Sequence, residues 1–310
     1  MADRPPRVLY ITGWMRSGST LLGNVLNELP GVLHVGELHY LWQNGVLASG
    51  TNSACGCGSS LSDCPHWGPM LEPVRSLDAE SLAHHMVMRQ HGLLRTRSTR
   101  LRLAEAQGRT APAPGLSELL DRTTTLYHSL QAKGGERLIV DGSKYPAEAA
   151  ALTGRTDVDV RILHMVRDPR ATAYSYRRTK DYIPPMSPAR SSGYWNAFNA
   201  ASELVGKAVP GRYLRIRHED LARHPRATVA EVLRFLGMDD EPPVDESGTV
   251  ELTGNHTVTG NPDRLRQGAI MIRPDERWRA ELSAREVAAA TAVGAPLLHR
   301  YGYPLLPSRS

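Results

Sequence analysis

Val8-Leu-Tyr-Ile-Thr12 and the following segment Gly13-Trp-Met-Arg-Ser-Gly-Ser-Thr20 decide the fold of this chain. The first run is short, apolar and partly β-branched, which is typical of a buried strand. Apolar residues then recur at helical spacing from Leu21 to Leu29, until Pro30-Gly31 ends the pattern. The order strand, glycine-containing loop and helix predicts a phosphate-binding turn in an α/β protein.

The predicted phosphate loop differs from that of a nucleoside triphosphatase at one position. It has the glycine spacing and the final Thr20, but Ser19 stands where a lysine is expected. Backbone N–H groups at a helix N-terminus bind any anion, whereas a triphosphatase also needs that lysine and Mg²⁺ for the β- and γ-phosphates. The loop therefore favours a 5′-phosphate whose transferable group carries less charge, with Arg16 as the nearest cation. The alternative is a plain turn between strand and helix.

The rest of the chain alternates strand and helix patterns. Three further buried strands are predicted at Leu138–Val140, Arg161–Val166 and Tyr213–Ile216, and later helices at 227–236 and 283–300. Strands that alternate with helices favour a mostly parallel sheet, so we expect an α/β, P-loop-like three-layer fold. The segment 248–274 is rich in Gly, Asn and Arg and predicts an ordered loop.

Residues from about 40 to 135 have a different pattern. A loop rich in Gly, Ser and Cys at 49–68 precedes helical stretches around 78–107 and 116–132, which a Pro-rich break at 111–115 separates. We interpret this segment as a helical insertion that shapes the acceptor side of a site. The chain shows no internal repeat and no long linker, so residues 1–310 are expected to form a single domain.

Composition sets broad limits on function. The net charge of +5 and the pI near 9.2 suit anionic ligands, and a hydrophobic fraction of 41% is enough for a continuous core. The apolar run Val8–Thr12 is too short for a signal sequence or a spanning helix. We therefore expect a cytoplasmic protein with no membrane span and no nucleic-acid partner, while the oligomeric state stays open.

A second phosphate site is predicted where the strand Arg161–Val166 ends. Arg167 follows the strand, Asp168-Pro169 begins a helix, and Ser175 lies two turns into that helix. Proline near a helix start and aspartate in the first turn are typical of helix initiation. Arg167 and Ser175 can therefore converge on one phosphate.

These motifs together resemble the PAPS-dependent sulfotransferase family, where PAPS is 3′-phosphoadenosine 5′-phosphosulfate. Arg16-Ser-Gly-Ser-Thr-Leu-Leu22 resembles the 5′-phosphosulfate loop, and Arg167 with Ser175 resembles the 3′-phosphate motif. The similarity extends to Arg217-His-Glu-Asp-Leu221 and to Gly260–Gly268. The resemblance implies PAPS as co-substrate without a required metal. It assigns cofactor binding to Arg16, Ser17, Gly18, Ser19, Thr20, Arg167 and Ser175.

The acceptor class is not indicated by the sequence. Arg16 occupies the place of a lysine in cytosolic phenol and steroid sulfotransferases, so the loop is closer to the tyrosylprotein and carbohydrate branches. The acceptor hydroxyl can belong to a small molecule, a glycan or a natural product. Two alternatives are a small-molecule kinase that uses the same loop, and a nucleotide-binding protein without catalysis.

Catalytic roles follow from the chemistry of in-line sulfuryl transfer. Charge grows on the leaving bisphosphate, and Arg16 is the first candidate to stabilise it. The acceptor must lose a proton, for which Glu37 is the best candidate and His34 and His39 are the alternatives. Lys144 resembles the family's second catalytic cation. Ser143, just before it, is a lesser candidate ligand of the co-substrate.

Three other groups of residues are candidates for binding. Arg264 and Arg266 lie in a segment that resembles the late family loop over the 3′-phosphate. Cys55, Cys57, Cys64 and His66 offer three thiols and an imidazole, which suffice for tetrahedral zinc, although their spacing is not the paired C-x₂-C pattern and buried thiols are the alternative. The arginines from Arg89 to Arg102 form either a solvated helix face or a patch for an anionic acceptor or membrane surface.

Overall fold

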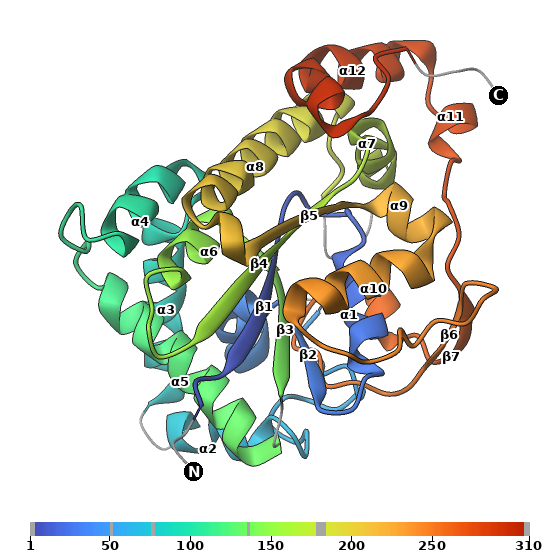
Figure 1. The fold of residues 1–310 in the computed structure, drawn as a ribbon. Coiled ribbons are helices and arrows are strands. Elements are labelled where there is room, and N and C mark those ends of the chain that lie inside the picture. Colours follow the sequence, from blue (N-terminus) through green and yellow to red (C-terminus); the bar gives the residue numbers. More distant parts are fainter. Residues whose placement is uncertain (1–3, 50–51, 76–77, 135–136, 178–183, 307–310) are drawn as a thin grey trace.

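A five-stranded parallel sheet forms the centre of the computed structural model, which describes residues 4–49, 52–75, 78–134, 137–177 and 184–306. The strand order is β2-β3-β1-β4-β5, so that the predicted first strand lies in the middle (Figure 1). The strands are β1 Arg7–Thr12, β2 Val32–Gly36, β3 Leu138–Lys144, β4 Asp159–Val166 and β5 Tyr213–Arg217. The expected α/β class and parallel sheet are confirmed.

Alternating side chains of β1 enter two different cores. Val8 and Tyr10 belong to one hydrophobic cluster, and Leu9 and Ile11 belong to the other. This follows from the two-residue period of a strand, which points successive side chains to opposite faces. Both faces of the sheet are covered, and this explains why β1 is apolar at nearly every position.

Helices cover the two faces and complete the three layers (Figure 1). Leu9 and Ile11 pack with α1 Ser19–Asn27, α9 His218–Arg223 and α10 Pro225–Leu236. The opposite face is covered by α6 Pro146–Leu152 and by α8 Pro188–Ala208, together with helices of the segment between β2 and β3. That segment holds 3₁₀ helices Leu38–Tyr40 and Thr96–Ser98, a π-helix Leu41–Val46, α2 Gly68–Arg75, α3 Ala79–Leu93, α4 Thr99–Ala106 and α5 Leu116–Gly134.

The arginine run between 89 and 102 is divided between solvent and interior. Arg95, Arg97 and Arg100 are exposed, in agreement with a solvated face. Arg102 instead is buried, and its guanidinium donates to the carboxylate of Glu105 at 2.9 Å. The interpretation of the whole run as one exposed face or patch is therefore wrong for Arg102.

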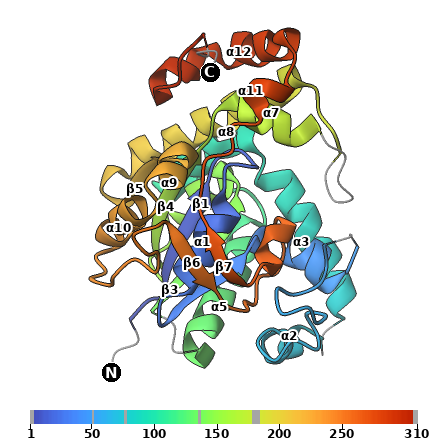
Figure 2. The ribbon, with the colours of Figure 1, turned by 90° about the vertical axis from the view of Figure 1, so that its right-hand side faces the viewer.

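The C-terminal third adds a helical layer and a hairpin. Helices α11 Trp278–Glu281 and α12 Ala284–Leu298 pack on the earlier helix α7 Pro169–Arg177, and short 3₁₀ turns lie at Pro210–Arg212, Pro262–Leu265 and His299–Tyr301. Strands β6 Thr249–Leu252 and β7 Gly268–Met271 pair antiparallel and lie near α1 (Figure 2). The prediction of an ordered loop over 248–274 was wrong for the residues of these two strands. Of the helices in the described ranges, none combines the length and apolar character needed to cross a bilayer.

Candidate active site

A cavity of about 790 Å³ opens where the five parallel strands end. The segments that follow β1, β2, β4 and β5 and the last residue of β3 all reach it, as expected for a ligand site at the carboxyl edge of an α/β sheet. Residues 259–263, 275 and 277 close the cavity from the C-terminal part of the chain. The predicted phosphate loop and the predicted second phosphate site therefore face one space.

The phosphate loop has the backbone geometry of a tight turn into α1. Gly13 and Gly18 have φ values of 128° and 90°, which favour glycine. A Cβ at Gly13 would overlap the carbonyl oxygen of Met165, so the loop runs directly against the end of β4. Gly18 is the N-cap of α1, and Gly18, Ser19 and Thr20 line the cavity. Ser17 is buried and does not line it.

Arg16 connects the two predicted phosphate sites. Its Nε donates to the hydroxyl of Ser175 at 2.8 Å, and its carbonyl accepts from the Arg167 guanidinium at 3.2 Å. All three residues line the cavity. Burial lowers the pKa of Arg167 although Glu219 and Asp275 oppose that shift, and its guanidinium pairs with Asp275 at 3.8 Å. A positively charged wall with a hydroxyl is therefore assembled from two segments far apart in sequence.

Glu37 and Lys144 form an ion pair in the lining of the same cavity. The Lys144 ammonium contacts the Glu37 carboxylate and also donates to the carbonyl of Gly142 at 3.0 Å. Lys144 is held at φ 75° and Arg16 at φ 70°, a left-handed region that non-glycine residues seldom adopt and that clusters at functional sites. Both members of the pair line the cavity, as Arg16 does, so a carboxylate, an ammonium and a guanidinium share one lining.

The two histidines considered as alternative bases face elsewhere. His34 is buried, its Nδ1 lies 3.1 Å from the amide oxygen of Asn24, and burial lowers its pKa to about 3. His39 is buried with its Nδ1 2.8 Å from Glu148. Neither ring is part of the cavity lining, whereas Glu37 is.

Ser143 lies beneath the cavity rather than in its lining. Its hydroxyl donates to Asp141 and accepts from the backbone N–H of His39. The Tyr127 hydroxyl also donates to Asp141, at 2.7 Å. Burial raises the pKa of Asp141 to about 6, with the Glu148 charge adding to the effect and the hydrogen bonds opposing it. Ser143 thus supports the end of β3 and does not point to a ligand.

Arg264 and Arg266 are not brought to the cavity. Arg264 is buried and donates to the carbonyls of Ala54 at 2.7 Å and Thr257 at 3.0 Å. Arg266 is exposed and pairs with Asp263 at 3.1 Å. Arg264 holds the late segment against the insertion and Arg266 forms a local surface ion pair, in contrast to the phosphate role that the resemblance implies for them.

Sequence reasoning missed Arg277, Asp275 and His218 as individual lining residues. Arg277 makes a two-pronged contact with Asp275, at 2.8 and 2.9 Å. His218 packs against Gly18, and burial lowers its pKa to about 3. His218 could have been found, because it lies in the Arg217–Leu221 motif, whereas nothing in the local sequence marks Arg277 as different from other arginines.

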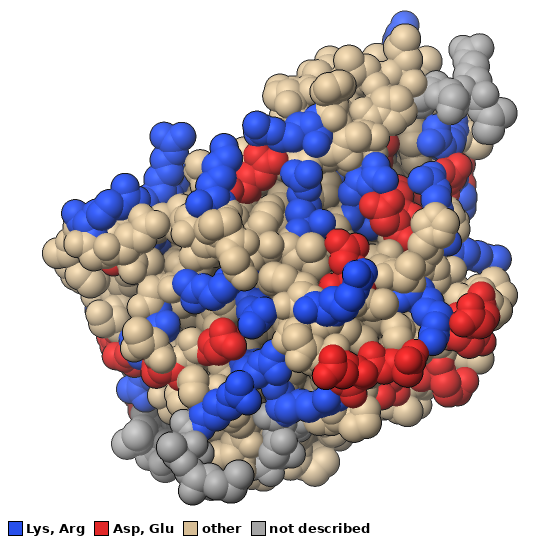
Figure 3. Space-filling model, in the orientation of Figure 1, with Lys and Arg blue, Asp and Glu red and all other residues tan. Residues whose placement is uncertain are grey.

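The charges around the cavity are nearly balanced. Among the residues that the structure describes, four cationic side chains and three carboxylates line it, namely Arg16, Lys144, Arg167, Arg277, Glu37, Asp263 and Asp275. On the face shown in Figure 3, basic side chains are spread over most of the surface, in keeping with the net charge of +5. An anion that enters the cavity therefore meets Lys144, Arg167 and Arg277 already engaged with carboxylates, and it adds to or replaces those contacts.

The three cysteines form a cluster with a different histidine from the one predicted. Cys55, Cys57 and Cys64 meet His256, whereas His66 stacks on the ring of His256 with the centroids 5.1 Å apart. The assignment of His66 to this group of possible ligands was therefore wrong.

Comparison with known proteins gives a consistent result. A model of the sulfotransferase family matches residues 6–242. Human carbohydrate sulfotransferase 3 is 25% identical over 168 residues, which cover 48% of this chain and 34% of that protein. Carbohydrate sulfotransferase 1 of Danio rerio is 32% identical over 102 residues, covering 32% and 23%. The matched part thus amounts to about a third or less of the length of these curated relatives.

Two solved structures share the fold over nearly the whole chain. The sulfotransferase domain of the Synechococcus PCC 7002 olefin synthase has a TM-score of 0.55 at 22% identity and covers 99% of this chain and 98% of its own. The sulfotransferase domain of the curacin biosynthetic pathway has a TM-score of 0.55 at 19% identity and covers 97% and 100%. At these identities the likeness establishes the architecture.

Proposed function

Because this chain belongs to the sulfotransferase family, we propose that it moves a sulfuryl group from PAPS to the hydroxyl of an acceptor. The observation that carries the proposal is the meeting of Glu37 and Lys144 beside the Arg16–Ser175 contact in one cavity. Nucleotide binding requires the cations, whereas transfer to a hydroxyl also requires a group that takes up the proton. A general base beside an anion site is what transfer to a hydroxyl requires.

The donor is held at two places. The start of α1 and the loop before it bind the 5′-phosphosulfate through backbone N–H groups. Arg167 and Ser175 bind the 3′-phosphate, with Arg277 as an additional cation at the rim of the cavity. A nucleotide with both phosphates therefore contacts more of the cavity than one with the 5′-phosphate alone.

The transfer is an in-line displacement at sulfur. The acceptor oxygen forms a bond to sulfur while its proton passes to the Glu37 carboxylate. The bond from sulfur to the 5′-phosphate oxygen breaks, and the electron pair stays on the leaving adenosine 3′,5′-bisphosphate. Arg16 and Lys144 stabilise the charge that develops on that oxygen, a type of contribution worth roughly 3 to 4 kcal/mol per donor in other enzymes. Donor binding separates Lys144 from Glu37 and leaves the carboxylate for the acceptor.

The acceptor side is polar in character. The insertion contributes Tyr40, Gln43, Asn44 and Asn52 to the cavity. Amide side chains donate and accept hydrogen bonds at once, so they match the hydroxyl groups of a sugar. We accordingly place a glycan or a glycosylated small molecule first among acceptors, and the names of the matched carbohydrate sulfotransferases agree with that order.

The donor assignment is tested by thermal unfolding with nucleotides. A ligand that binds only the native state raises stability by mass action, so adenosine 3′,5′-bisphosphate should raise the Tm clearly more than AMP at the same concentration. Arg167→Ala should remove most of that difference and leave the AMP shift nearly unchanged. Equal shifts from the two nucleotides on the unaltered protein would rule out the 3′-phosphate site.

The reaction is tested with labelled donors. Incubation with ³⁵S-labelled PAPS and a panel of sugars and glycosides should label an acceptor, and the labelled product identifies the acceptor class. The competing kinase assignment predicts transfer from γ-labelled ATP with Mg²⁺ instead. Label from ATP and none from PAPS would replace the sulfotransferase proposal with the kinase.

A further inference from the structure

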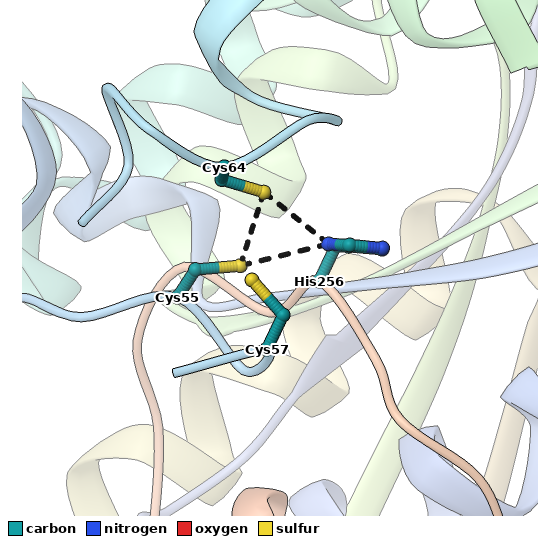
Figure 4. Close-up of side chains that lie close together, drawn as sticks. All are labelled: Cys55, Cys57, Cys64 and His256. Carbon is teal, nitrogen blue, oxygen red and sulfur yellow. Dashed lines mark hydrogen bonds between the residues drawn. The ribbon is translucent and has the colours of Figure 1, made fainter. Parts of the chain in front are cut away.

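Three thiols and one imidazole converge at a point outside the cavity (Figure 4). Cys55, Cys57 and Cys64 come from the start of the insertion, and His256 comes from the segment after β6. Their four ligand atoms all lie within 4.8 Å of one another. Cys55 and Cys64 are buried, and the sulfur of Cys57 points towards theirs.

The spacing of these atoms matches the edges of a tetrahedron around a metal. The Cys55 and Cys64 sulfurs are 3.5 Å apart, and His256 Nδ1 is 3.8 and 3.2 Å from them. Zinc–sulfur bonds of about 2.3 Å and zinc–nitrogen bonds of about 2.0 Å at tetrahedral angles give edges of roughly 3.8 Å for sulfur pairs and roughly 3.5 Å for sulfur to nitrogen. These three distances thus fit such a site within a few tenths of an ångström.

We propose that Cys55, Cys57, Cys64 and His256 form a structural zinc site of the Cys₃His type. Three soft thiolates and one imidazole in tetrahedral arrangement are the donor set that selects zinc. With four protein ligands no position is left for water or substrate, so the metal has a structural role rather than a catalytic one. The site is independent of the proposed reaction.

The zinc fastens one wall of the cavity. Near it, the Trp67 indole donates to the carbonyl of His256 at 2.6 Å, and the N–H of Gly56 donates to Thr257 at 2.9 Å. The side chain of Asn52 donates to the carbonyl of Gly260 at 2.6 Å, and both residues line the cavity. The metal therefore joins two segments about 200 residues apart that together carry the lining.

A disulfide explains fewer of the four converging side chains than a metal does. A bond between Cys55 and Cys64 would use two sulfurs and leave Cys57 and His256 facing it without a role. It would also require the sulfurs to approach to about 2.05 Å. The convergence of a third thiol and of an imidazole from a distant segment is explained by a metal.

The first test is the metal content of the purified full-length protein, grown with zinc and isolated without chelator. Elemental analysis should find about one zinc per chain, as expected for a closed four-ligand site. Replacement by Co²⁺ should give the intense visible bands of tetrahedral cobalt with sulfur-to-metal charge transfer. Zinc near zero, with a Cys55–Cys64 disulfide in the mass spectrum of freshly purified protein, would overturn the proposal.

Matched variants identify the histidine. His256→Phe should lose the metal on dialysis against a chelator, whereas His66→Phe, which keeps the stacked ring, should retain it. Cys57→Ser provides a second variant at an exposed residue, so its loss of zinc is not a failure to fold. Loss of zinc from His66→Phe but not from His256→Phe would refute the ligand set. These readouts do not depend on sulfuryl transfer, so failure of the proposed activity leaves them interpretable.

Discussion

The proposed function assigns chemistry to Glu37 and donor binding to Arg167. Glu37 is paired with Lys144, and Arg167 contacts the carbonyl of Arg16 in the phosphate loop. An interaction with a remote phosphate acts chiefly on binding, whereas a base acts in the transition state. The two substitutions should therefore have opposite kinetic effects.

Glu37→Gln should lower turnover by about 10²-fold or more, the typical loss for a general base, while donor affinity stays nearly intact. The amide keeps the size of the side chain but cannot take the acceptor proton. Steady-state kinetics on the identified acceptor, with nucleotide affinity from calorimetry, provides the measurement. His39→Gln is a suitable comparison, because His39 lies beside Glu37 but does not line the cavity. Turnover of Glu37→Gln at the unaltered level would disprove the base assignment.

Local sequence was sufficient for the residues that lie within or directly after a motif. Arg16 and Arg167 follow strand ends and Ser175 lies two turns into the helix after Arg167, so their convergence follows from a parallel sheet. His256 could not be predicted, because the partner Cys64 lies 192 positions away. For Arg264 the local sequence was misleading. Its surroundings resemble a phosphate loop, but its guanidinium donates to the buried carbonyls of Thr257 and Ala54.

At the scale of elements, the phosphate loop depends on the close approach of two backbones. Gly13 has φ 128° and faces the carbonyl of Met165 at the end of β4. Gly108 also has a positive φ, of 68°, but a Cβ there would meet no atom within 4 Å. A comparison of Gly13 with Gly108 therefore separates the free-energy cost of the left-handed backbone from the cost of steric overlap.

Gly13→Ala should lower the free energy of unfolding by about 2 to 5 kcal/mol, the sum of left-handed strain and overpacking. Gly108→Ala should lower it by about 1 to 2 kcal/mol, since only the strain applies. Urea unfolding of both variants gives the comparison. A Gly13→Ala loss no larger than that of Gly108→Ala would show that the loop does not press against β4.

Elements with strong periodicity were predictable, and short ones were not. The four predicted strands all appear, because β-branched and aliphatic runs buried on both faces leave a clear pattern. Strand β2 was missed, since His34 and two flanking glycines interrupt its apolar character. Strands β6 and β7 have four residues each, and pairing with each other rather than with the central sheet stabilises them.

At the scale of the whole molecule, acid should unfold the protein through its buried histidines. Burial is the first cause that lowers the pKa of His34 to about 3, of His164 to about 4 and of His218 to about 3. The unfolded value is near 6.5, so the unfolded chain binds more protons below that pH. Their stabilising contribution is thus complete above pH 6.5 and is lost as the pH falls towards 4.

Stability should fall between pH 6.5 and 4.5 by about 1 kcal/mol or more per pH unit, the effect of at least one net proton. Burial raises the pKa of Asp141 to about 6 and also raises that of Glu219, and these two groups oppose the loss without matching three histidines. Urea unfolding midpoints across this range test the slope. A midpoint that is constant or rises towards pH 4.5 would contradict it.

The late segment closes the cavity through contacts between Asn52 and Gly260 and between Glu37 and Thr259. These contacts also determine when, during synthesis, a new chain becomes able to bind its ligand. All five strands of the sheet have been synthesised by residue 217, whereas the cavity is completed by residues up to 277. At about 5 to 20 residues per second, translation of the remaining segment takes several seconds. The sheet can therefore assemble on the ribosome before any nucleotide can be held. The chain can bind its ligand only after the late segment has left the ribosome and packed against the insertion.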